Sequence, residues 1–357
     1  MSGRLDLRRG VVVSADPLEV EVAGERRPAW ADEVLLGEMR EGDEVVVNVA
    51  ALDLALGSGG FDVVHVNLSR GLEGGERGDE HVMKLNYTSL QHPVNPVEEG
   101  GVEFVRRGRT NSIDTEAGRR TVPVLVLPLH GHLAPAVWAA AQAQPDLRVG
   151  YVQTAGGALP GSISRDVAEL RRRELLCGHI TAAPAYGGEH EALSTVGAVG
   201  AAAMRLGWDA ILVGPGPGII GSETEFGHGG MAALDSAHAA LSLGMPALLS
   251  PRLSSADPRE RHRGLSHHTA TVLGLLLASV EVAMPADFDQ IGSELQAATG
   301  ARHRLTEAPV DLAAYGASGL PTTTMGRALE DDPAFFAAPL AAGTLLSRVE
   351  SRGTPKP

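Results

Sequence analysis

Near-continuous apolar runs alternate with longer helical segments from residue 122 to residue 284, and this alternation constrains the fold more than any other feature. Short apolar runs of this kind suit strands that are buried on both faces of a parallel sheet. We therefore predict an α/β fold with a mainly parallel, Rossmann-like sheet and helices on both faces. Strands are predicted at 122–129, 148–153, 179–183, 209–213, 245–250 and 280–284, and helices at 135–144, 164–176, 191–206, 230–243 and 267–278.

The first hundred residues instead have the pattern of β structure. Short Val-rich runs at 10–14, 18–22, 44–49 and 62–67 are separated by Asp-Pro, Gly-Asp and Gly-rich turns, which is typical of a small barrel or sandwich. A chain of 357 residues also exceeds what one hydrophobic core usually supports. We predict a small β-barrel-like domain at 1–105, a linker at 106–121, and an α/β domain with a helical C-terminal tail at 122–357.

Composition restricts the partners that we expect. The net charge of −14 argues against nucleic-acid binding, which needs basic surface to neutralise phosphates. No apolar run reaches the roughly 20 residues that span a bilayer, and residues 1–9 lack the apolar stretch of a secretory signal. Cys177 is the only cysteine, which suits a reducing compartment. We therefore expect a cytoplasmic protein that binds neither membrane nor nucleic acid, and a homo-oligomer is compatible with the sequence.

Polar, Gly-rich loops follow five of the predicted strands, whereas the turns at the opposite ends are short and plain. Ligands of open parallel sheets bind outside the carboxyl ends of the strands, so this asymmetry predicts a ligand pocket at one edge of the sheet. Polar loops are common on any surface, so loop composition does not identify a ligand. The loops lie at 130–132, 154–162, 186–190, 214–230 and 252–266.

The fourth loop contains a G-x-G-x-x-G pattern at Gly216, Gly218 and Gly221, directly after the strand that ends near Gly214. Glycines at such positions let the backbone approach a phosphate, so the loop is a candidate anion-binding element. Dinucleotide binding is disfavoured because Pro217 removes an N–H donor, the next helix starts only near residue 229, and no acidic residue ends the next strand. A purely structural Gly/Pro turn is the other interpretation. Glu223 and Glu225 in the same loop are candidate acid/base groups or metal ligands, or simply solvated acids.

Residues 257–269 contain the densest group of candidate functional side chains in the sequence. Arg259, Arg261 and Arg263 are candidates for binding a phosphate or carboxylate. Ser266 suits the N-cap of the following helix, which would place His267 and His268 in its first turn and keep their imidazoles neutral. The alternative is an arginine-rich surface loop paired with acids, among them Asp257, and one buried histidine.

Histidines in other strand-end loops raise the question of a metal ion. His130 and His132 form an H-x-H pair after the first α/β strand, and His190 and His228 lie in two further loops. Imidazoles that converge from different loops can bind zinc or another divalent metal, together with Asp257 or Glu189. We assign His130 and His132 as the candidate metal ligands, while the identity of any cofactor stays open.

Several of these motifs together resemble a bacterial family catalogued as domain of unknown function 3866. The resemblance covers nearly the whole chain up to about residue 285, and the block at 257–269 is its most specific part. It implies a bacterial source and a shared history of the β and α/β domains, and it implies no activity, substrate or cofactor. The matching segments are 42–48, 57–60, 84–88, 130–132, 151–160, 186–188, 214–221 and 257–269.

The leading hypothesis is an enzyme that acts on a small anionic, phosphorylated or nucleotide-like metabolite. His267 or His268 would serve as acid/base or electrophile, and Asp257 would orient a histidine. The anion would be held by Gly214, Gly216, Gly218, Gly221, Arg259, Arg261 and Arg263. A metabolite-binding or sensing protein without catalysis is the first alternative. A structural or assembly protein that uses the β domain as an interface is the second.

Overall fold

The computed structural model describes residues 4–56, 59–72, 74–75, 78–99 and 122–348. The chain divides into two compact units, Met1–Glu80 and His81–Pro357. The linker predicted at 106–121 lies outside the described residues. Within the described residues, no helix combines the length and the apolar character needed to cross a membrane.

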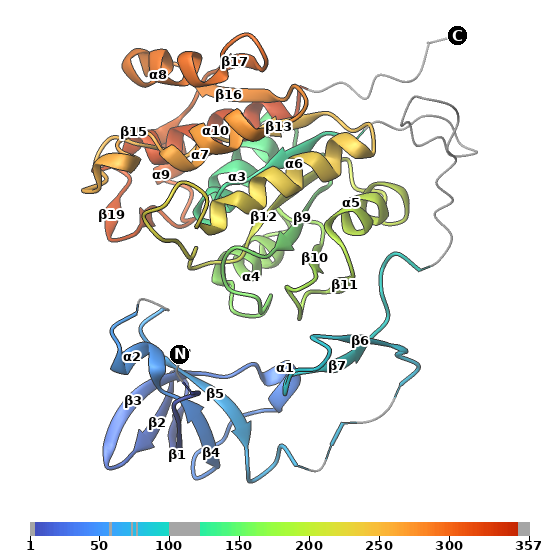
Figure 1. Cartoon of the computed structure of the whole chain (residues 1–357), viewed down its shortest axis with the longest axis vertical. Helices are drawn as coiled ribbons and strands as arrows, with labels where there is room; N and C mark the ends of the chain where they lie inside the picture. The colour runs from blue at the N-terminus through green and yellow to red at the C-terminus, as the bar shows by residue number, and fades with distance from the viewer. Residues whose placement is uncertain (1–3, 57–58, 73, 76–77, 100–121, 349–357) are drawn as a thin grey trace. The chain divides into compact units, whose positions relative to one another are not determined.

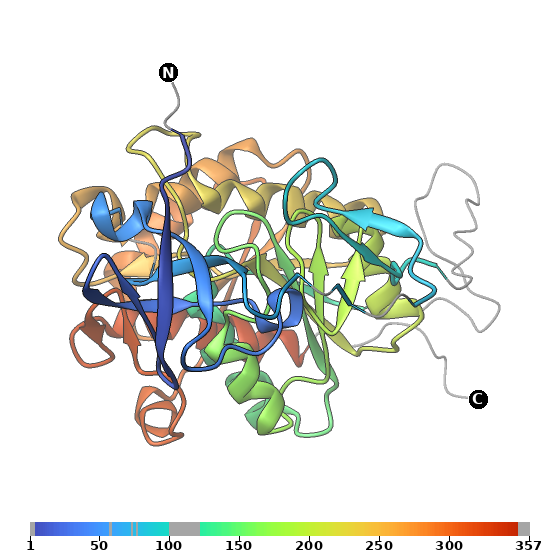
Figure 2. The same cartoon turned by 90° about the horizontal axis from the view of Figure 1, so that it is seen from below.

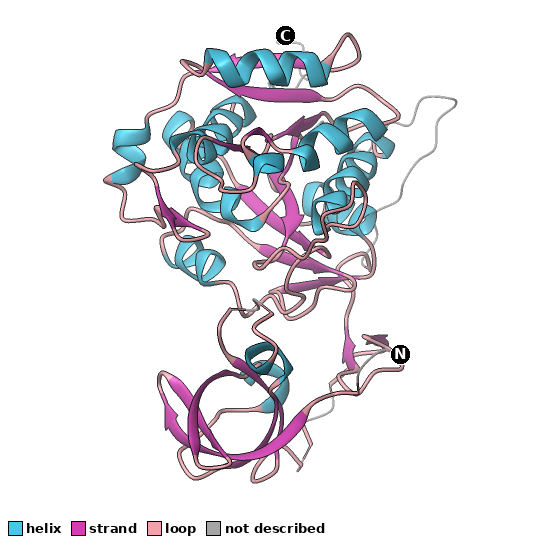
Figure 3. Cartoon of the chain, turned by 60° about the vertical axis from the view of Figure 1, so that its left-hand side comes forward, coloured by secondary structure: helices cyan, strands magenta, loops and turns pink. Residues whose placement is uncertain are grey.

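The N-terminal unit is a closed five-stranded barrel, which confirms the predicted barrel-like domain (Figure 3). Its interior is filled by valines, among them Val20, Val45 and Val47. The strand β3 was not predicted, because its charged residues interrupt the alternation of apolar and polar residues that indicates a strand. One of them, Arg27, pairs with Asp62 at 2.6 Å. The strands, in the barrel order, are β1 (Leu7–Ala15), β2 (Leu18–Val22), β3 (Glu25–Trp30), β5 (Asp62–Asn67) and β4 (Glu44–Asn48), with the short helices α1 (Glu33–Leu36) and α2 (Ala50–Asp53) between them.

The second unit is built on an eight-stranded sheet in which every pairing is parallel, as predicted for the α/β part of the chain. The order across the sheet is β11-β10-β9-β12-β8-β13-β16-β17. The bounds are β8 (Val124–Val126), β9 (Val149–Thr154), β10 (His179–Ala182), β11 (His190–Ala192), β12 (Ala210–Pro215), β13 (Ala247–Leu249), β16 (Glu281–Pro285) and β17 (Arg304–Ala308).

Helices cover both faces of this sheet (Figure 1). One apolar cluster packs α5 (Thr195–Met204), α6 (Ala232–Ser242), α7 (His267–Leu275) and α8 (Asp289–Thr299) against the sheet. The cluster on the other face contains α3 (Leu133–Ala143), α4 (Arg165–Arg172), α9 (Leu312–Gly316) and α10 (Pro333–Leu346).

The strand order creates a switch point at the centre of the sheet. The chain runs outward from β8 through β9 and β10 to β11, returns at β12, and then continues on the other side of β8 with β13. The helix that follows β8 and the helix that follows β12 lie on opposite faces. The loops after β8, β12 and β13 lie side by side at the carboxyl ends of these neighbouring strands, which is where open α/β sheets bind ligands.

Three sequence predictions about this unit need correction. The strand at 280–284 is not the last, because β17 pairs with β16 at the sheet edge. The helix predicted from residue 191 begins at Thr195, because His190–Ala192 is the edge strand β11 and Ser194 caps the helix. The tail also contains, besides helices, the hairpin β18 (Thr323–Thr324) and β19 (Arg327–Ala328). The loop after β13 forms a second small sheet from β14 (Leu253–Ser254) and β15 (Gly264–Leu265), around the 3₁₀ turn Glu260–His262.

A hairpin of β6 (Val82–Lys84) and β7 (His92–Val94) lies beside the β10–β11 edge of the sheet (Figure 2). The buried Lys84 ammonium donates to the carbonyl of Thr181 at 2.8 Å and pairs with Glu191. Val97, also buried, joins the apolar cluster of the α5 face. Residues 81–99 therefore belong to the α/β unit.

Candidate functional site

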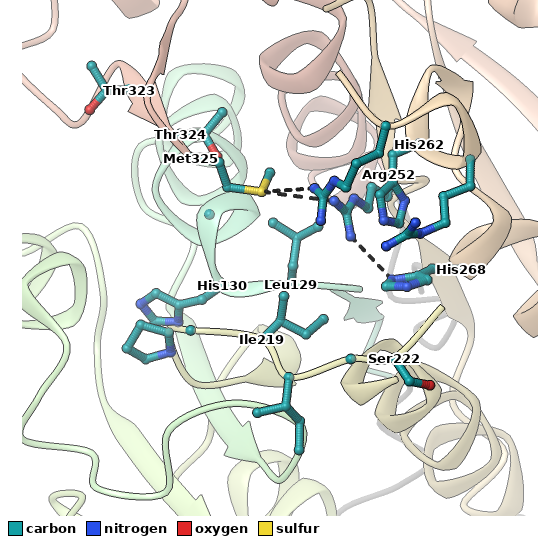
Figure 4. Close-up of a pocket in the computed structure, with 17 residues that line it drawn as sticks. Leu129, His130, Ile219, Ser222, Arg252, His262, His268, Thr323, Thr324 and Met325 are labelled. Atoms are coloured by element: carbon teal, nitrogen blue, oxygen red, sulfur yellow. Dashed lines mark hydrogen bonds between the residues drawn. The ribbon is translucent and has the colours of Figure 1, made fainter. Parts of the chain in front are cut away.

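A pocket of about 400 Å³ lies at the switch point of the sheet. Its walls come from the loops after β8, β12 and β13, from the first turn of α7, and from the β18–β19 hairpin. Figure 4 shows His130 on one side of it, with Arg252, His262 and His268 on the other. The loops after β9 and β10 do not line it, although the sequence grouped all five loops together.

Basic side chains dominate the charge of this pocket. Arg252, Arg259 and Arg261 line it, and among the described lining residues there is no Asp or Glu. Arg252 is almost fully buried, whereas the side chains of Arg259 and Arg261 are 42% and 33% exposed. Burial lowers the pKa of Arg252 to about 10, which leaves it charged at pH 7. An anion is therefore the ligand that the pocket favours electrostatically.

Asp257 is a fully buried carboxylate that organises these arginines. It accepts hydrogen bonds from Nε and Nη2 of Arg259 at 2.9 and 2.8 Å, and Arg252 and Arg327 approach it at 3.6 and 3.5 Å. Burial acts to raise the pKa of Asp257, but Arg259 and Arg327 outweigh it and hold that pKa well below its usual range. The structure thus places the carboxylate against arginines, whereas the sequence assigned it to orient a histidine.

The first turn of α7 is formed as the sequence predicts. Ser266 is the N-cap and its hydroxyl accepts from the backbone N–H of His268, so His267 and His268 open the helix. His262 contacts the same hydroxyl through Nδ1 at 2.7 Å. His228, which precedes α6, stacks on His268 with ring centroids 3.6 Å apart. Four imidazoles from three segments therefore meet at the pocket wall.

These imidazoles are neutral at pH 7. Burial, with Arg252 nearby, lowers the pKa of His268 to about 2 and that of His262 to about 3. Burial also lowers the pKa of His228 and of His267. The sequence argument expected neutral rings from the helix dipole, but burial is the larger cause. Neutral imidazole can accept a proton, donate a hydrogen bond or bind a metal ion.

The glycines of the fourth loop divide into two groups. Gly218 and Gly221 line the pocket, and Gly218 has a φ of +68° that favours glycine. Gly214 and Gly216 do not line it. A Cβ at Gly214 would lie 2.8 Å from Cβ of Leu127, and one at Gly216 would lie 2.3 Å from the carbonyl oxygen of Ala158. Close backbone packing therefore explains these two glycines.

His130 and His132 lie in different surroundings. His130 lines the pocket, and its Nε2 hydrogen-bonds Oγ of Ser164 at 2.8 Å. His132 is fully buried, with Nδ1 2.9 Å from Oγ of Ser250 and its ring against Phe335. Among the described residues, the side chains that gather with metal-ligand spacing are those of His228, His267 and His268, and this group does not include the H-x-H pair.

The remaining predicted residues lie outside the pocket lining. Arg263 contacts the backbone carbonyl of Asp257 at 3.4 Å, and Glu189 pairs with Arg171. Glu223, which is highly exposed, pairs with Arg261 at 3.2 Å.

Sequence reasoning missed three contributors to the site. Arg252 and His262 line the pocket, and so does the hairpin that includes Met325. The sulfur of Met325 lies 3.9 Å from Arg252 and 3.7 Å from Arg259. The position of Arg252 directly after a strand end was a usable clue, but nothing in the tail sequence indicated that it returns to the pocket.

Comparison with known proteins identifies the family. A family model described as protein of unknown function, DUF3866, matches residues 29–343. The chain belongs to this family. The match confirms the resemblance inferred from the sequence motifs. No curated protein and no solved structure matches this DUF3866 chain.

The match spans every loop that lines the pocket, from Leu129 to Met325. The pocket therefore lies wholly inside the DUF3866 region. In chemical terms it offers cationic anchors, exposed backbone at Gly218 and Gly221, and neutral imidazoles beside them. This combination suits binding an anion next to a group that transfers protons or holds a metal.

Proposed function

We propose that this protein is an enzyme that acts on a small anionic metabolite, bound in the pocket at the switch point. The observation that supports it best is the set Arg252, Arg259 and Arg261 in a pocket whose described lining has no carboxylate. A phosphate or carboxylate group is the ligand whose oxygens match guanidinium donors. The cytoplasm remains the predicted location, since the single Cys177 thiol suits a reducing compartment.

The buried Arg252 strengthens the argument for an anion. Its guanidinium is charged, nearly inaccessible to water, and 3.6 Å from the one carboxylate, Asp257, that it shares with Arg259 and Arg327. A buried charge that is incompletely paired is costly. An anion in the pocket supplies the missing countercharge, so its binding is favoured.

Of the two roles predicted for His268, acid/base and electrophile, we propose the electrophile. It lines the pocket, it is neutral, and Arg252 Nη1 donates to its Nδ1 at 3.2 Å. Because arginine only donates, this contact leaves the proton of the neutral ring on Nε2. The Nε2–H group of His268 can then donate a hydrogen bond to a bound substrate and polarise it, as a neutral electrophile does.

Titration calorimetry with inorganic phosphate and with a panel of phosphorylated and carboxylated metabolites tests the proposal. We expect at least one of these ligands to bind, and Arg259→Gln to weaken that binding by about tenfold or more, the loss of one charge-assisted hydrogen bond. Arg172→Gln is the matched control, because Arg172 is exposed on α4 and pairs only locally with Glu169. Its binding should equal that of the wild type.

Turnover separates an enzyme from a binding protein. Incubation of the bound metabolite with wild type and with His268→Ala should give product only with the wild type. Stoichiometric binding without product favours the sensing alternative. The anion site itself is wrong if none of these anions binds, or if Arg259→Gln binds them as tightly as the wild type.

A further inference from the structure

Three histidines beside the pocket bring ring nitrogens into one small space. One nitrogen from each of His228, His267 and His268 lies within 4.8 Å of the other two. His228 comes from the end of the loop after β12, and the other two come from the N-terminus of α7. The group is thus assembled from two loops of the switch point.

Nitrogens of His228 and His267 are buried without a hydrogen-bond partner. Nε2 of His228 donates to the carbonyl of Glu225 at 2.9 Å, because a carbonyl oxygen only accepts. Nδ1 of the neutral His228 ring therefore keeps its lone pair, and this atom is buried without a hydrogen-bond partner in the structure. Nε2 of His267 is likewise buried and without a partner. A buried nitrogen without a partner is costly unless a ligand satisfies it.

The backbone leaves room in front of these rings. A Cβ at Gly230 would lie 3.0 Å from Nδ1 of His228 and 3.1 Å from Nδ1 of His268. The space that a side chain at Gly230 would fill therefore lies beside both nitrogens. A histidine whose second nitrogen donates to a backbone carbonyl is also the usual arrangement around a bound metal, and His228 has it through Glu225.

We propose that His228, His267 and His268 bind a divalent transition metal, with zinc as the best fit. Three imidazoles are a ligand set found at catalytic zinc ions, which keep a fourth position open. Magnesium and calcium prefer carboxylate and carbonyl oxygens, and the described group contains imidazoles alone. His268 lines the pocket, so a metal held by His268 would lie beside the proposed anion site and could offer a further position to a ligand.

A bound metal would compete with Arg252 for Nδ1 of His268. Its hydrogen bond to Nδ1 of His268 must be replaced if that nitrogen becomes the ligand. Asp257, 3.6 Å from Nη2 of Arg252, keeps the guanidinium paired when this bond is lost. A metal and an arginine around one pocket would both attract the same anionic group.

This inference goes beyond the proposed function and does not require it. Zinc binding measured in a phosphate-free buffer supports the metal site even if no metabolite binds. Binding of a metabolite in the presence of a chelator supports the anion site even if no metal binds. The two proposals can therefore fail separately.

The test is zinc titration of the full chain after treatment with a chelator, followed by calorimetry and by the visible spectrum of the cobalt-substituted protein. We expect one zinc per chain and the intense visible absorption of tetrahedral cobalt. His228→Gln and His268→Gln should each weaken zinc binding by about 100-fold or more, because even outer-shell changes around a metal cost about 10–100-fold. Zinc should also raise the melting temperature of the wild type and not that of His228→Gln.

The control is His65→Gln, which removes an imidazole from β5 of the barrel and should bind zinc like the wild type. Circular dichroism of each variant shows whether it is folded before titration. His228→Gln keeps a side-chain N–H that can donate to Glu225, so it preserves the loop while removing the ligand. The proposal is wrong if the folded wild type binds no zinc, or if both variants bind it unchanged.

Discussion

At the residue scale, burial decides what each histidine can do. His132 and His179 are buried around the sheet, and the rings of His130, His262 and His268 are buried at the pocket. Burial removes water from the imidazolium form, so the pKa of each of these rings is lowered from its usual value of 6.5. Neutral rings that face the pocket are available for chemistry, whereas neutral rings inside the sheet layers affect stability alone.

The effect of a buried neutral histidine on stability can be measured at His179. Burial, followed by His130 and Arg171, lowers its pKa to about 3, while the unfolded chain has a value of about 6.5. Between these values the unfolded state binds a proton that the folded state excludes. The stabilisation is therefore complete above pH 6.5 and is lost as the pH falls toward 3.

We predict that His179→Phe reduces the dependence of unfolding free energy on pH. Phenylalanine can keep the stack on Tyr151, whose ring centroid lies 5.5 Å from that of His179. Urea unfolding from pH 7 down to about pH 4 should give a slope smaller by up to one proton, about 1.4 kcal/mol per pH unit. An identical slope in variant and wild type would contradict the assignment.

At the scale of single elements, glycine has opposite roles in two helices. Gly274 lies in α7, and a Cβ there would have no atom within 4 Å. Gly343 lies in α10, where a Cβ would be 2.1 Å from the carbonyl oxygen of Ala136 on α3. The second glycine therefore sets how closely α3 and α10 pack, whereas the first only lowers helix propensity.

Alanine substitutions at the two glycines should change stability in opposite directions. Gly274→Ala should raise the unfolding free energy by about 0.5–1 kcal/mol, because alanine favours the helix. Gly343→Ala should lower it by about 1–3 kcal/mol, because the helices must move apart. Urea denaturation measures both. Destabilisation by Gly274→Ala would show that α7 has less free space than the structure gives it.

At the scale of the whole molecule, residues 81–99 are part of the α/β unit. Lys84 and Glu191 form a buried pair, and Thr181 and the backbone N–H of Gly187 bond to the same two side chains. Val94 and Val97 are buried in this segment as well. Removing it would leave Glu191 without its cation.

Two truncated chains test this division. A chain that starts at His81 should unfold in one cooperative transition, because its sheet and both apolar clusters lie within His81–Pro357. A chain that starts at residue 106 should be less stable by about 3 kcal/mol or more, the cost of leaving a buried charge unpaired. Differential scanning calorimetry compares them. Equal melting temperatures would mean that Lys84 adds nothing to the unit.

The sequence by itself determined the elements whose pattern lies within a short stretch of neighbouring residues. Apolar runs of strand length between helical segments are buried on both faces, so the parallel sheet follows from residues 122–284 alone. Ser266 could be recognised as the cap of α7 because capping depends on its own position relative to the helix start. The valine runs of the barrel could be recognised as strands because their pattern lies within a few neighbouring residues. The strand β3 could not be recognised, because its charged Arg27 is neutralised by partners that are distant in the sequence.

Only the tertiary structure decided which of these loops meet. The loops after β8, β12 and β13 converge because β8 lies between the other two strands. The order of strands in a sheet cannot be predicted from the periodicity of apolar residues. The same order separates the loops after β9 and β10 from the pocket and brings in the β18–β19 hairpin from the tail. Long-range packing also places His228 on His268 and brings Arg327 to 3.5 Å from Asp257, contacts that no local pattern indicates.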